Sequence, residues 1–472
     1  MRYLLLCLLA FTSLTLAAQI DGKWYGILDA MGTKLPLALD VANNGTAGSM
    51  SSPSQTQAKF PFSAATFDGK LLKVTVGDLG AEFSGALDGK ELRGIFTQAG
   101  VDFPLTFTRH VPDGFPIGDE PITIVQRPQD PKDFPYEREA ISFAGGAEGV
   151  TLAGELTRPS AGKPKAVVVL ISGSGPQDRN SYLGSQINHS PFLVLSDYLT
   201  RRGYAVLRYD ERGVGESTGE FGVATTYDLA EDARAAVRYL RQRKDYKRAM
   251  IGLIGHSEGG VIAPMVAGEE ELDFTVLLAA PAVPGDSLQM VQRRAFARSM
   301  NIPMAMVERE EPGLRRAFAF IKESPGLDQD QYVEALYALF EREMVNLPEP
   351  LRRSITDPRK FNAQYVVPLS SPWMRAWIGL DPKPYLLQLT MPTLALNGTL
   401  DTQVPAALNL NAISAAMATN GNKKYERALL PGLNHLFQPA ETGAPSEYGT
   451  IPTTFSPVAL DKIGTWLDKH FD

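Results

Sequence analysis

The chain has 472 residues, of which 44% are apolar and 21% are charged. A chain of this size and composition buries a large hydrophobic core, which excludes disorder, collagen and coiled coil and favours two domains. Lys and Arg number 46 against 53 Asp and Glu, a net charge of −7 with both signs interspersed, which argues against a nucleic-acid partner.

The first residues have the three parts of a secretory signal peptide. Arg2 precedes an apolar run over residues 4–16, and small residues follow at positions 17 and 18. We therefore expect residues 1–18 to be cleaved and the mature protein to be periplasmic or secreted. The alternative is a membrane anchor, but the run is shorter than the roughly 20 residues that span a bilayer, so no stable membrane insertion is expected. Cleavage would remove Cys7, the only cysteine of the chain.

Residues 19–111 are predicted to form a small antiparallel β-barrel-like domain. Asp-Gly-Lys recurs at Asp21, Asp68 and Asp88, which is a hairpin signal because glycine adopts positive φ without steric cost. No cluster of titratable residues accompanies these strands, so we expect a binding or packing module. The alternating segments are Lys23–Leu28, Lys34–Asp40, Lys70–Val76, Ala81–Leu87, Glu91–Thr97 and Val101–Thr108.

Residues 112–137 are predicted to form a linker, because six prolines between Pro112 and Pro135 block regular helix and sheet interiors. From residue 138 to residue 472, continuous apolar runs alternate with longer amphipathic stretches. This pattern predicts a doubly wound, mostly parallel α/β sheet, with Val150–Thr157 as an antiparallel edge strand. The apolar runs are Ala166–Ser172, Tyr204–Asp210, Met250–Gly255, Phe274–Ala280, Thr393–Asn397 and Tyr425–Leu430.

A helical insertion at about 283–390 separates two of the predicted strands. It is rich in methionine and also contains Trp373 and Trp377. Flexible thioethers and aromatic rings suit an adaptable apolar pocket wall, but they suit the insertion's own core equally well. We expect most of these residues in the core and a minority at a pocket.

Gly255-His256-Ser257-Glu258-Gly259 directly follows an apolar strand and opens a helical segment. This is the Gly-x-Ser-x-Gly pattern in a strand–turn–helix context, where a sharp turn exposes the serine and requires glycines beside it. Ser257 is therefore the predicted nucleophile. The backbone amide of Glu258 would stand at a helix N-terminus, where it can stabilise an oxyanion.

A nucleophilic serine needs a base, and the chain contains only five histidines. His435 follows the last apolar strand, at the sheet edge where such folds present their functional residues, and we predict it as the base. His256 is expected to point away from Ser257, and His189 stays a candidate for lining the site. Asp401, which follows the strand before His435, is predicted to orient it, although a helix-cap role is an alternative.

A second oxyanion donor is expected from the loop after the strand at 166–172, where glycines let the backbone approach a reacting centre. We predict the backbone amide of Ser174, with Gly175 as the alternative. The cluster Arg208–Ser217 crowds Asp210, Glu211 and Arg212 together. It is either a second acid/base site or an ion-pair loop that borders the pocket, and we favour the ion-pair loop.

The motifs Ser172–Arg179, Asp210–Ser217, Gly255–Gly260, Asn397–Asp401 and Asn434-His435 together resemble those of the α/β-hydrolase superfamily. Within it, they look like the bacterial serine carboxylesterase group that carries an N-terminal β-domain. The resemblance covers about residues 138–472.

This resemblance implies ester hydrolysis through an acyl-enzyme, with Ser257, His435 and Asp401 as the triad. It also implies that the insertion is a helical lid and that no metal or organic cofactor takes part. Many relatives have His-Gly before the oxyanion loop, whereas this chain has Ser172-Gly173.

The sequence thus predicts a secreted or periplasmic carboxylic ester hydrolase whose partner is a small-molecule ester. One alternative is a serine peptidase of the same fold, in which Glu258 would bind the substrate amine. A second alternative is a catalytically inactive protein that holds an apolar ligand. The sequence makes no prediction about the natural ester or the oligomeric state.

Overall fold

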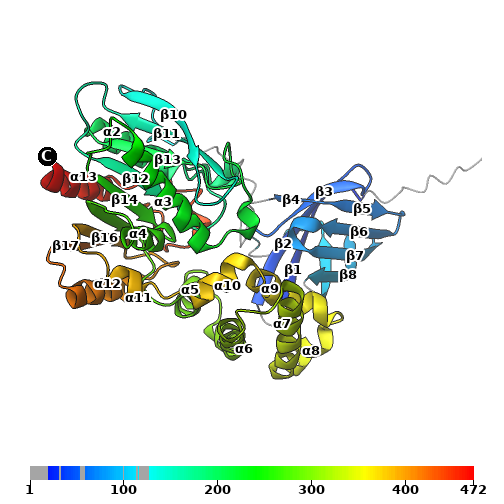
Figure 1. Cartoon of the computed structure of the whole chain (residues 1–472). Coiled ribbons are helices and arrows are strands. Elements are labelled where there is room, and N and C mark those ends of the chain that lie inside the picture. Colours follow the sequence, from blue (N-terminus) through cyan, green and yellow to red (C-terminus); the bar gives the residue numbers. More distant parts are fainter. Residues whose placement is uncertain (1–19, 31–32, 54–58, 99, 113–114, 116–126) are drawn as a thin grey trace, which may run out of the picture. The chain divides into compact units, whose positions relative to one another are not determined.

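The computed structural model describes residues 20–30, 33–53, 59–98, 100–112, 115 and 127–472 (Figure 1). The predicted signal peptide and much of the predicted linker therefore lie outside the described residues. The chain divides into two compact units. The first combines Met1–Pro121 with Glu341–Gln364, and the second combines Ile122–Phe340 with Tyr365–Asp472.

The first unit is built on an antiparallel sheet of nine strands in the order β4-β3-β2-β1-β9-β8-β7-β6-β5. The sheet curls so that β3 contacts β5, and the inward-facing residues, including Trp24, Leu39, Phe83 and Phe107, form its core. This agrees with the predicted β-barrel-like domain. Its strands are β1 (Gly22–Ala30), β2 (Thr33–Ala42), β3 (Ala47–Ser51), β4 (Lys59–Pro61), β5 (Ala64–Phe67), β6 (Leu71–Val76), β7 (Ala81–Asp88), β8 (Glu91–Gln98) and β9 (Val101–Thr108).

Two of the three Asp-Gly-Lys sequences form hairpin turns. Gly69 joins β5 to β6 with φ +94°, and Gly89 joins β7 to β8 with φ +60°. The hairpin expected at Asp21 is not present, because this residue precedes β1 and its carboxylate instead accepts hydrogen bonds from the amides of Asn44 and Gly45, at 2.9 and 3.0 Å.

Residues 341–364 belong to the insertion by sequence but group with the first unit. Helix α8 (Glu349–Ser354) contacts β9, Ile355 forms a β-bridge with Val101, and the amide of Thr356 donates to the carbonyl of Gly100 at 3.0 Å. A side chain at position 100 would place its Cβ 2.4 Å from the carbonyl oxygen of Asp357. The close packing of residues 355–357 against Gly100 thus requires a glycine at position 100. No strand or helix pattern in the sequence indicates this contact.

The second unit contains an eight-stranded sheet in the order β10-β11-β13-β12-β14-β15-β16-β17. Strands β10 and β11 are antiparallel to their neighbours and the others are parallel. The expectation that 150–157 is the edge strand is wrong, because β10 covers β11. The strands are β10 (Glu137–Ala144), β11 (Thr151–Arg158), β12 (Val167–Ile171), β13 (Ala205–Tyr209), β14 (Ile251–His256), β15 (Phe274–Leu278), β16 (Thr393–Gly398) and β17 (Tyr425–Leu430).

Helices cover both faces of this sheet, as expected for strands that are apolar throughout. Along β12, Val167 and Val169 pack with α3, α4 and α12, whereas Val168 and Leu170 pack with α2 and α13 on the other face. Figure 1 shows the two helical layers. The helices of these layers are α2 (Pro191–Arg201), α3 (Thr226–Gln242), α4 (Gly259–Ala267), α12 (Ala406–Asn420) and α13 (Pro457–Phe471), and the short helix α1 (Gly184–Ile187) precedes α2.

The predicted insertion lies between β15 and β16 and is helical. Besides α8, it contains α5 (Gly285–Ser299), α6 (Met304–Glu323), α7 (Gln329–Glu343), α9 (Pro358–Leu369), α10 (Pro372–Gly379) and α11 (Lys383–Leu386). Within the described ranges, none of the helices is both long and apolar enough to cross a membrane.

Candidate active site

Ser257 stands on a sharp turn between β14 and α4. Its φ is +54°, a left-handed conformation that is strained for a residue with a β-carbon, and its amide donates to the carbonyl of Leu278 at 2.9 Å. A Cβ at Gly255 would lie 2.0 Å from the carbonyl oxygen of Gly259, and a Cβ at Gly259 would lie 2.2 Å from that of Ile171. Both glycines of the motif are therefore needed for the turn.

His435 and Asp401 lie together beyond the ends of β17 and β16. His435 Nδ1 is 2.8 Å from Asp401 Oδ2, and both side chains are buried. The other carboxylate oxygen of Asp401 accepts the amides of Gln403 and Val404, at 2.9 and 2.8 Å. Helix α12 begins later, at Ala406, so Asp401 fixes a turn before the helix rather than capping it.

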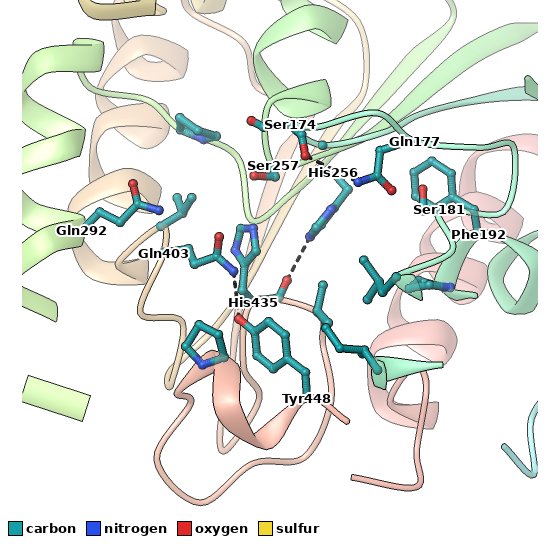
Figure 2. Close-up of a pocket in the computed structure, with 18 of the residues that line it drawn as sticks. Ser174, Gln177, Ser181, Phe192, His256, Ser257, Gln292, Gln403, His435 and Tyr448 are labelled. Carbon is teal, nitrogen blue, oxygen red and sulfur yellow. Dashed lines mark hydrogen bonds between the residues drawn. The ribbon is translucent and has the colours of Figure 1, made fainter. Parts of the chain in front are cut away.

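His256 lies against His435, a contact that the sequence did not predict. The two ring centroids are 4.8 Å apart, and His256 Nε2 is 2.9 Å from the backbone carbonyl oxygen of His435 (Figure 2). A carbonyl only accepts, so Nε2 of His256 carries the proton. Burial, with the neighbouring His435, lowers the pKa of His256 to about 3, so this ring is neutral and holds the His435 loop in place.

The predicted oxyanion loop approaches the nucleophile closely. A Cβ at Gly173 would lie 3.0 Å from Ser257 Cβ, and Ser174 lines the same cavity as Ser257. Glu211 braces this loop, because its carboxyl group accepts from the Ser172 hydroxyl at 3.1 Å and from the Gln177 amide at 2.9 Å. Burial raises the pKa of Glu211 well above its usual range.

The neighbours of Glu211 form ion pairs with residues outside their own cluster. Asp210 pairs with Arg179 at 2.6 Å, and Arg212 pairs with Asp232 at 2.7 Å. These contacts agree with the favoured ion-pair loop. Neither Asp210 nor Arg212 lines the cavity.

Glu258 turns its side chain into the protein. Its carboxyl oxygen Oε1 accepts from the Thr226 hydroxyl at 2.5 Å and from the indole N–H of Trp373 at 2.7 Å, and the residue is 1% exposed. Burial raises the pKa of this carboxyl group. Its backbone, just before α4, adjoins Ser257, whereas its carboxyl group does not line the cavity and is engaged with α3 and α10.

The cavity in front of Ser257 and His435 has a volume of about 380 Å³. Figure 2 shows its labelled residues arranged around the two catalytic candidates. The insertion contributes Trp373 and Trp377, stacked with centroids 5.5 Å apart, and none of its methionines, while Met290 lies in the insertion's own core. The lining residues are Gly173, Ser174, Gln177, Ser181, Leu183, Ile187, Pro191, Phe192, His256, Ser257, Pro281, Leu288, Gln289, Gln292, Trp373, Trp377, Gln403, Val404, His435, Leu436, Pro445, Tyr448 and Phe455.

Arg127, which sequence reasoning did not single out, ties together two segments of the cavity wall. Its guanidinium donates to the carbonyls of Asn188, Ile451 and Gly449, at 2.9, 2.7 and 2.8 Å, and also to that of Ile187. The predicted linker therefore includes an arginine that holds the α1 end and the 449–451 loop together. Its partners are backbone carbonyls, which leave no signal in the sequence.

His189 lies behind the cavity wall rather than in it. Its ring is buried, with Nδ1 2.7 Å from the Thr454 hydroxyl and Nε2 3.0 Å from the Ile451 carbonyl. Burial, with the charge of Arg127, lowers the pKa of His189 to about 4. Among the residues that the structure describes, no group of three or more His, Cys, Asp or Glu could hold a metal ion.

The chain was compared with known families and proteins. Residues 162–311 match the family model described as serine aminopeptidase, S33. Esterase EstD of Thermotoga maritima is 27% identical over 349 residues, which cover 72% of this chain and 69% of that protein. Monoglyceride lipase of Rattus norvegicus is 29% identical over 155 residues, 32% of this chain and 46% of the lipase.

Solved structures of low identity are also similar. A Pyrococcus furiosus esterase aligns with a TM-score of 0.42 and 18% identity, over 74% of this chain and 99% of that one. The family-model match over residues 162–311 and the similarity to an esterase, together with the doubly wound sheet, support the resemblance of this chain to the α/β-hydrolase superfamily.

Proposed function

We propose that this enzyme is a carboxylic ester hydrolase that acts through Ser257, His435 and Asp401. The observation that carries the proposal is the strained turn that presents Ser257 to the same cavity as His435, whose ring is bonded to buried Asp401 at 2.8 Å. The similarity to an esterase over most of the chain supports it.

In the proposed reaction, Ser257 Oγ attacks the ester carbonyl carbon while His435 Nε2 takes the serine proton. The amides of Ser174 and Glu258 hold the oxyanion of the tetrahedral intermediate. The C–O bond to the alcohol then breaks, and His435 returns the proton to the leaving alcohol. Water, activated by His435, hydrolyses the acyl-enzyme and releases the acid. Asp401 accepts from Nδ1–H of His435 throughout and holds the ring in place.

A peptidase is the second candidate, because the matching family model carries that description. An exopeptidase needs a charged group to bind the terminal amine or carboxylate of its substrate. None of the described residues that line the cavity is Asp, Glu, Lys or Arg, and the buried carboxyl group of Glu258 already accepts from Thr226 and Trp373 through Oε1. These contacts favour the ester hydrolase.

Hydrolysis of p-nitrophenyl butyrate and of the matched butyryl p-nitroanilide tests both candidates. The ester should be turned over and the anilide should not, and Ser257→Ala should abolish turnover and labelling by a fluorophosphonate. Ser142→Ala, an exposed change on β10, serves as the control. An unlabelled Ser257 would favour an inactive ligand-binding protein, and equal rates on the two substrates would favour a peptidase.

We also propose that the protein is exported and loses residues 1–18. The basic, apolar and small-residue parts of this segment support the proposal. N-terminal sequencing of the protein recovered from cell fractions tests it. A mature protein that still begins at Met1 in the cytoplasm would refute it.

A further inference from the structure

One end of the cavity contains polar atoms without partners. Ser181 Oγ and Gln177 Oε1 are buried, and neither has a hydrogen-bond partner within the described part of the chain. Ser181 is 8% exposed, and both residues line the same cavity as Phe192 (Figure 2). A buried polar group without a partner destabilises a fold, so two at one end of a binding cavity point to a bound group that satisfies them.

The backbone and the hydroxyl of Ser181 have to be considered separately. Its φ is +50°, in the left-handed region that glycine or asparagine occupies at lower cost. A serine here adds backbone strain and, in the free protein, an unpaired hydroxyl. The turn that follows Asp178 accounts for the backbone conformation, because the Ser181 amide donates to the Asp178 carbonyl at 2.9 Å and Asp178 Oδ1 accepts the amides of Asn180 and Tyr182. The turn does not account for the unpaired hydroxyl, whereas a ligand that bonds it does.

The chemistry of the two atoms defines what they bind. Gln177 Oε1 only accepts hydrogen bonds, so its partner carries an O–H or N–H, and Ser181 Oγ can accept from or donate to the same group. The rest of the described wall is apolar or carries neutral polar groups, such as the amides of Gln289 and Gln292 and the hydroxyl of Tyr448, and its described residues include no acidic or basic side chain apart from the two imidazoles. A charged substrate would lose its hydration there without gaining a counter-charge.

We propose, on the basis of the ester hydrolase function above, that the substrate is a neutral ester with a free hydroxyl group that binds Gln177 and Ser181. The apolar remainder of the substrate lies against Phe192 and the tryptophan pair. The hydroxyl can belong to the acyl part or to the alcohol part, and the test separates these two sources.

The test compares kcat/KM for four esters of similar size. Butyl butyrate is the reference, butyl 3-hydroxybutyrate carries the hydroxyl on the acyl part, 4-hydroxybutyl butyrate carries it on the alcohol part, and monobutyl succinate adds a carboxylate. We expect one hydroxylated ester to exceed the reference about tenfold, the effect of one or two hydrogen bonds to otherwise unpaired groups, and the carboxylate to fall below it.

Two variants connect this preference to the site. Ser181→Gly removes the hydroxyl and tolerates the positive φ, and Gln177→Leu removes the acceptor while keeping the backbone amide that bonds Glu211. Each variant should bring the ratio of kcat/KM for the hydroxylated ester to kcat/KM for butyl butyrate down towards one. The matched controls are Asn301→Gly, also at positive φ, and Gln242→Leu at the exposed end of α3, which should leave the preference unchanged.

The two proposals fail differently. Ser257-dependent hydrolysis with equal kcat/KM for all four esters, or a preference that survives both variants, overturns the hydroxyl site and leaves the ester hydrolase standing. A carboxylate ester that is the best substrate also overturns it. Absence of Ser257-dependent hydrolysis for every ester overturns the ester hydrolase and the hydroxyl site together.

Discussion

Asp401 makes two kinds of hydrogen bond, and two substitutions at this position separate their effects. One carboxylate oxygen accepts from His435, and the other accepts from the amides of Gln403 and Val404. Asp401→Asn can keep its carbonyl oxygen on the two amides, but it turns an NH₂ group towards His435 Nδ1. Asp401→Ala removes all three contacts.

The magnitudes follow from these contacts. In Asp401→Asn, two donors would face each other, so His435 adopts the tautomer protonated at Nε2 and can no longer take the proton of Ser257. We expect kcat/KM to fall about 10⁴-fold, equivalent to about 5.4 kcal/mol. In Asp401→Ala, two buried amides also lose bonds to a charged acceptor, each worth about 1.5–3 kcal/mol.

The assay pairs p-nitrophenyl butyrate kinetics with urea unfolding of the wild type and both variants. Both variants should be nearly inactive, Asp401→Asn should unfold close to the wild type, and Asp401→Ala should unfold at clearly lower urea. Asp401→Asn that keeps more than a tenth of the activity would refute the orienting role. Equal stability of the two variants would refute the turn-fixing role.

Three further predictions follow from single residues. Gly255→Ala should lose activity and thermal stability, because its Cβ would meet the Gly259 carbonyl oxygen at 2.0 Å; an active, stable variant would contradict this. Burial raises the pKa of Glu211, so the folded protein keeps a proton that the unfolded chain releases, and this stability is lost as pH rises above about 4.5. Glu211→Gln cannot lose this proton, so the difference in unfolding free energy between the variant and the wild type should rise with pH, by up to about 1.4 kcal/mol per pH unit. Urea unfolding at several pH values measures this difference, and a difference that does not change with pH would contradict the prediction. Arg127→Lys cannot reach all its carbonyl partners, so KM should rise about tenfold with kcat less affected, and an unchanged KM would exclude the wall-holding role.

The parts of the site that depend on local backbone geometry could be predicted from the sequence. The turn at Ser257 requires glycines at fixed spacing, and β16 and β17 are apolar enough to place the residues that follow them, Asp401 and His435, at one sheet edge. The contact between His256 and His435 was not predicted, because a buried imidazole that bonds a backbone carbonyl leaves no pattern. Arg127 was missed for the same reason, since its partners lie 61 and more than 320 positions away.

The fold shows the same division between local and distant determinants. The long, regularly alternating or fully apolar strands were predicted within a few residues. Strands β3, β4 and β5 are short and largely half-exposed, and β10 is exposed at alternate positions, so their patterns were too weak to identify them. Residues 341–364 group with the first unit through contacts between residues far apart in the sequence, which include the Val101–Ile355 bridge, the hydrogen bond from Thr356 to Gly100 and the packing of α8 on β9, and no local pattern encodes them.

That grouping changes how the two units can be separated. The division falls once near residue 121 and twice more inside helices α7 and α9, so the chain crosses between the units three times. The first unit therefore cannot be deleted by a simple truncation at the N-terminus. A truncation that keeps only residues 122–472 would retain Ile355 and Thr356 but remove Gly100 and Val101, to which they bond. The truncation would therefore leave unpaired backbone groups inside the insertion, which also supplies Trp373 and Trp377 to the cavity wall.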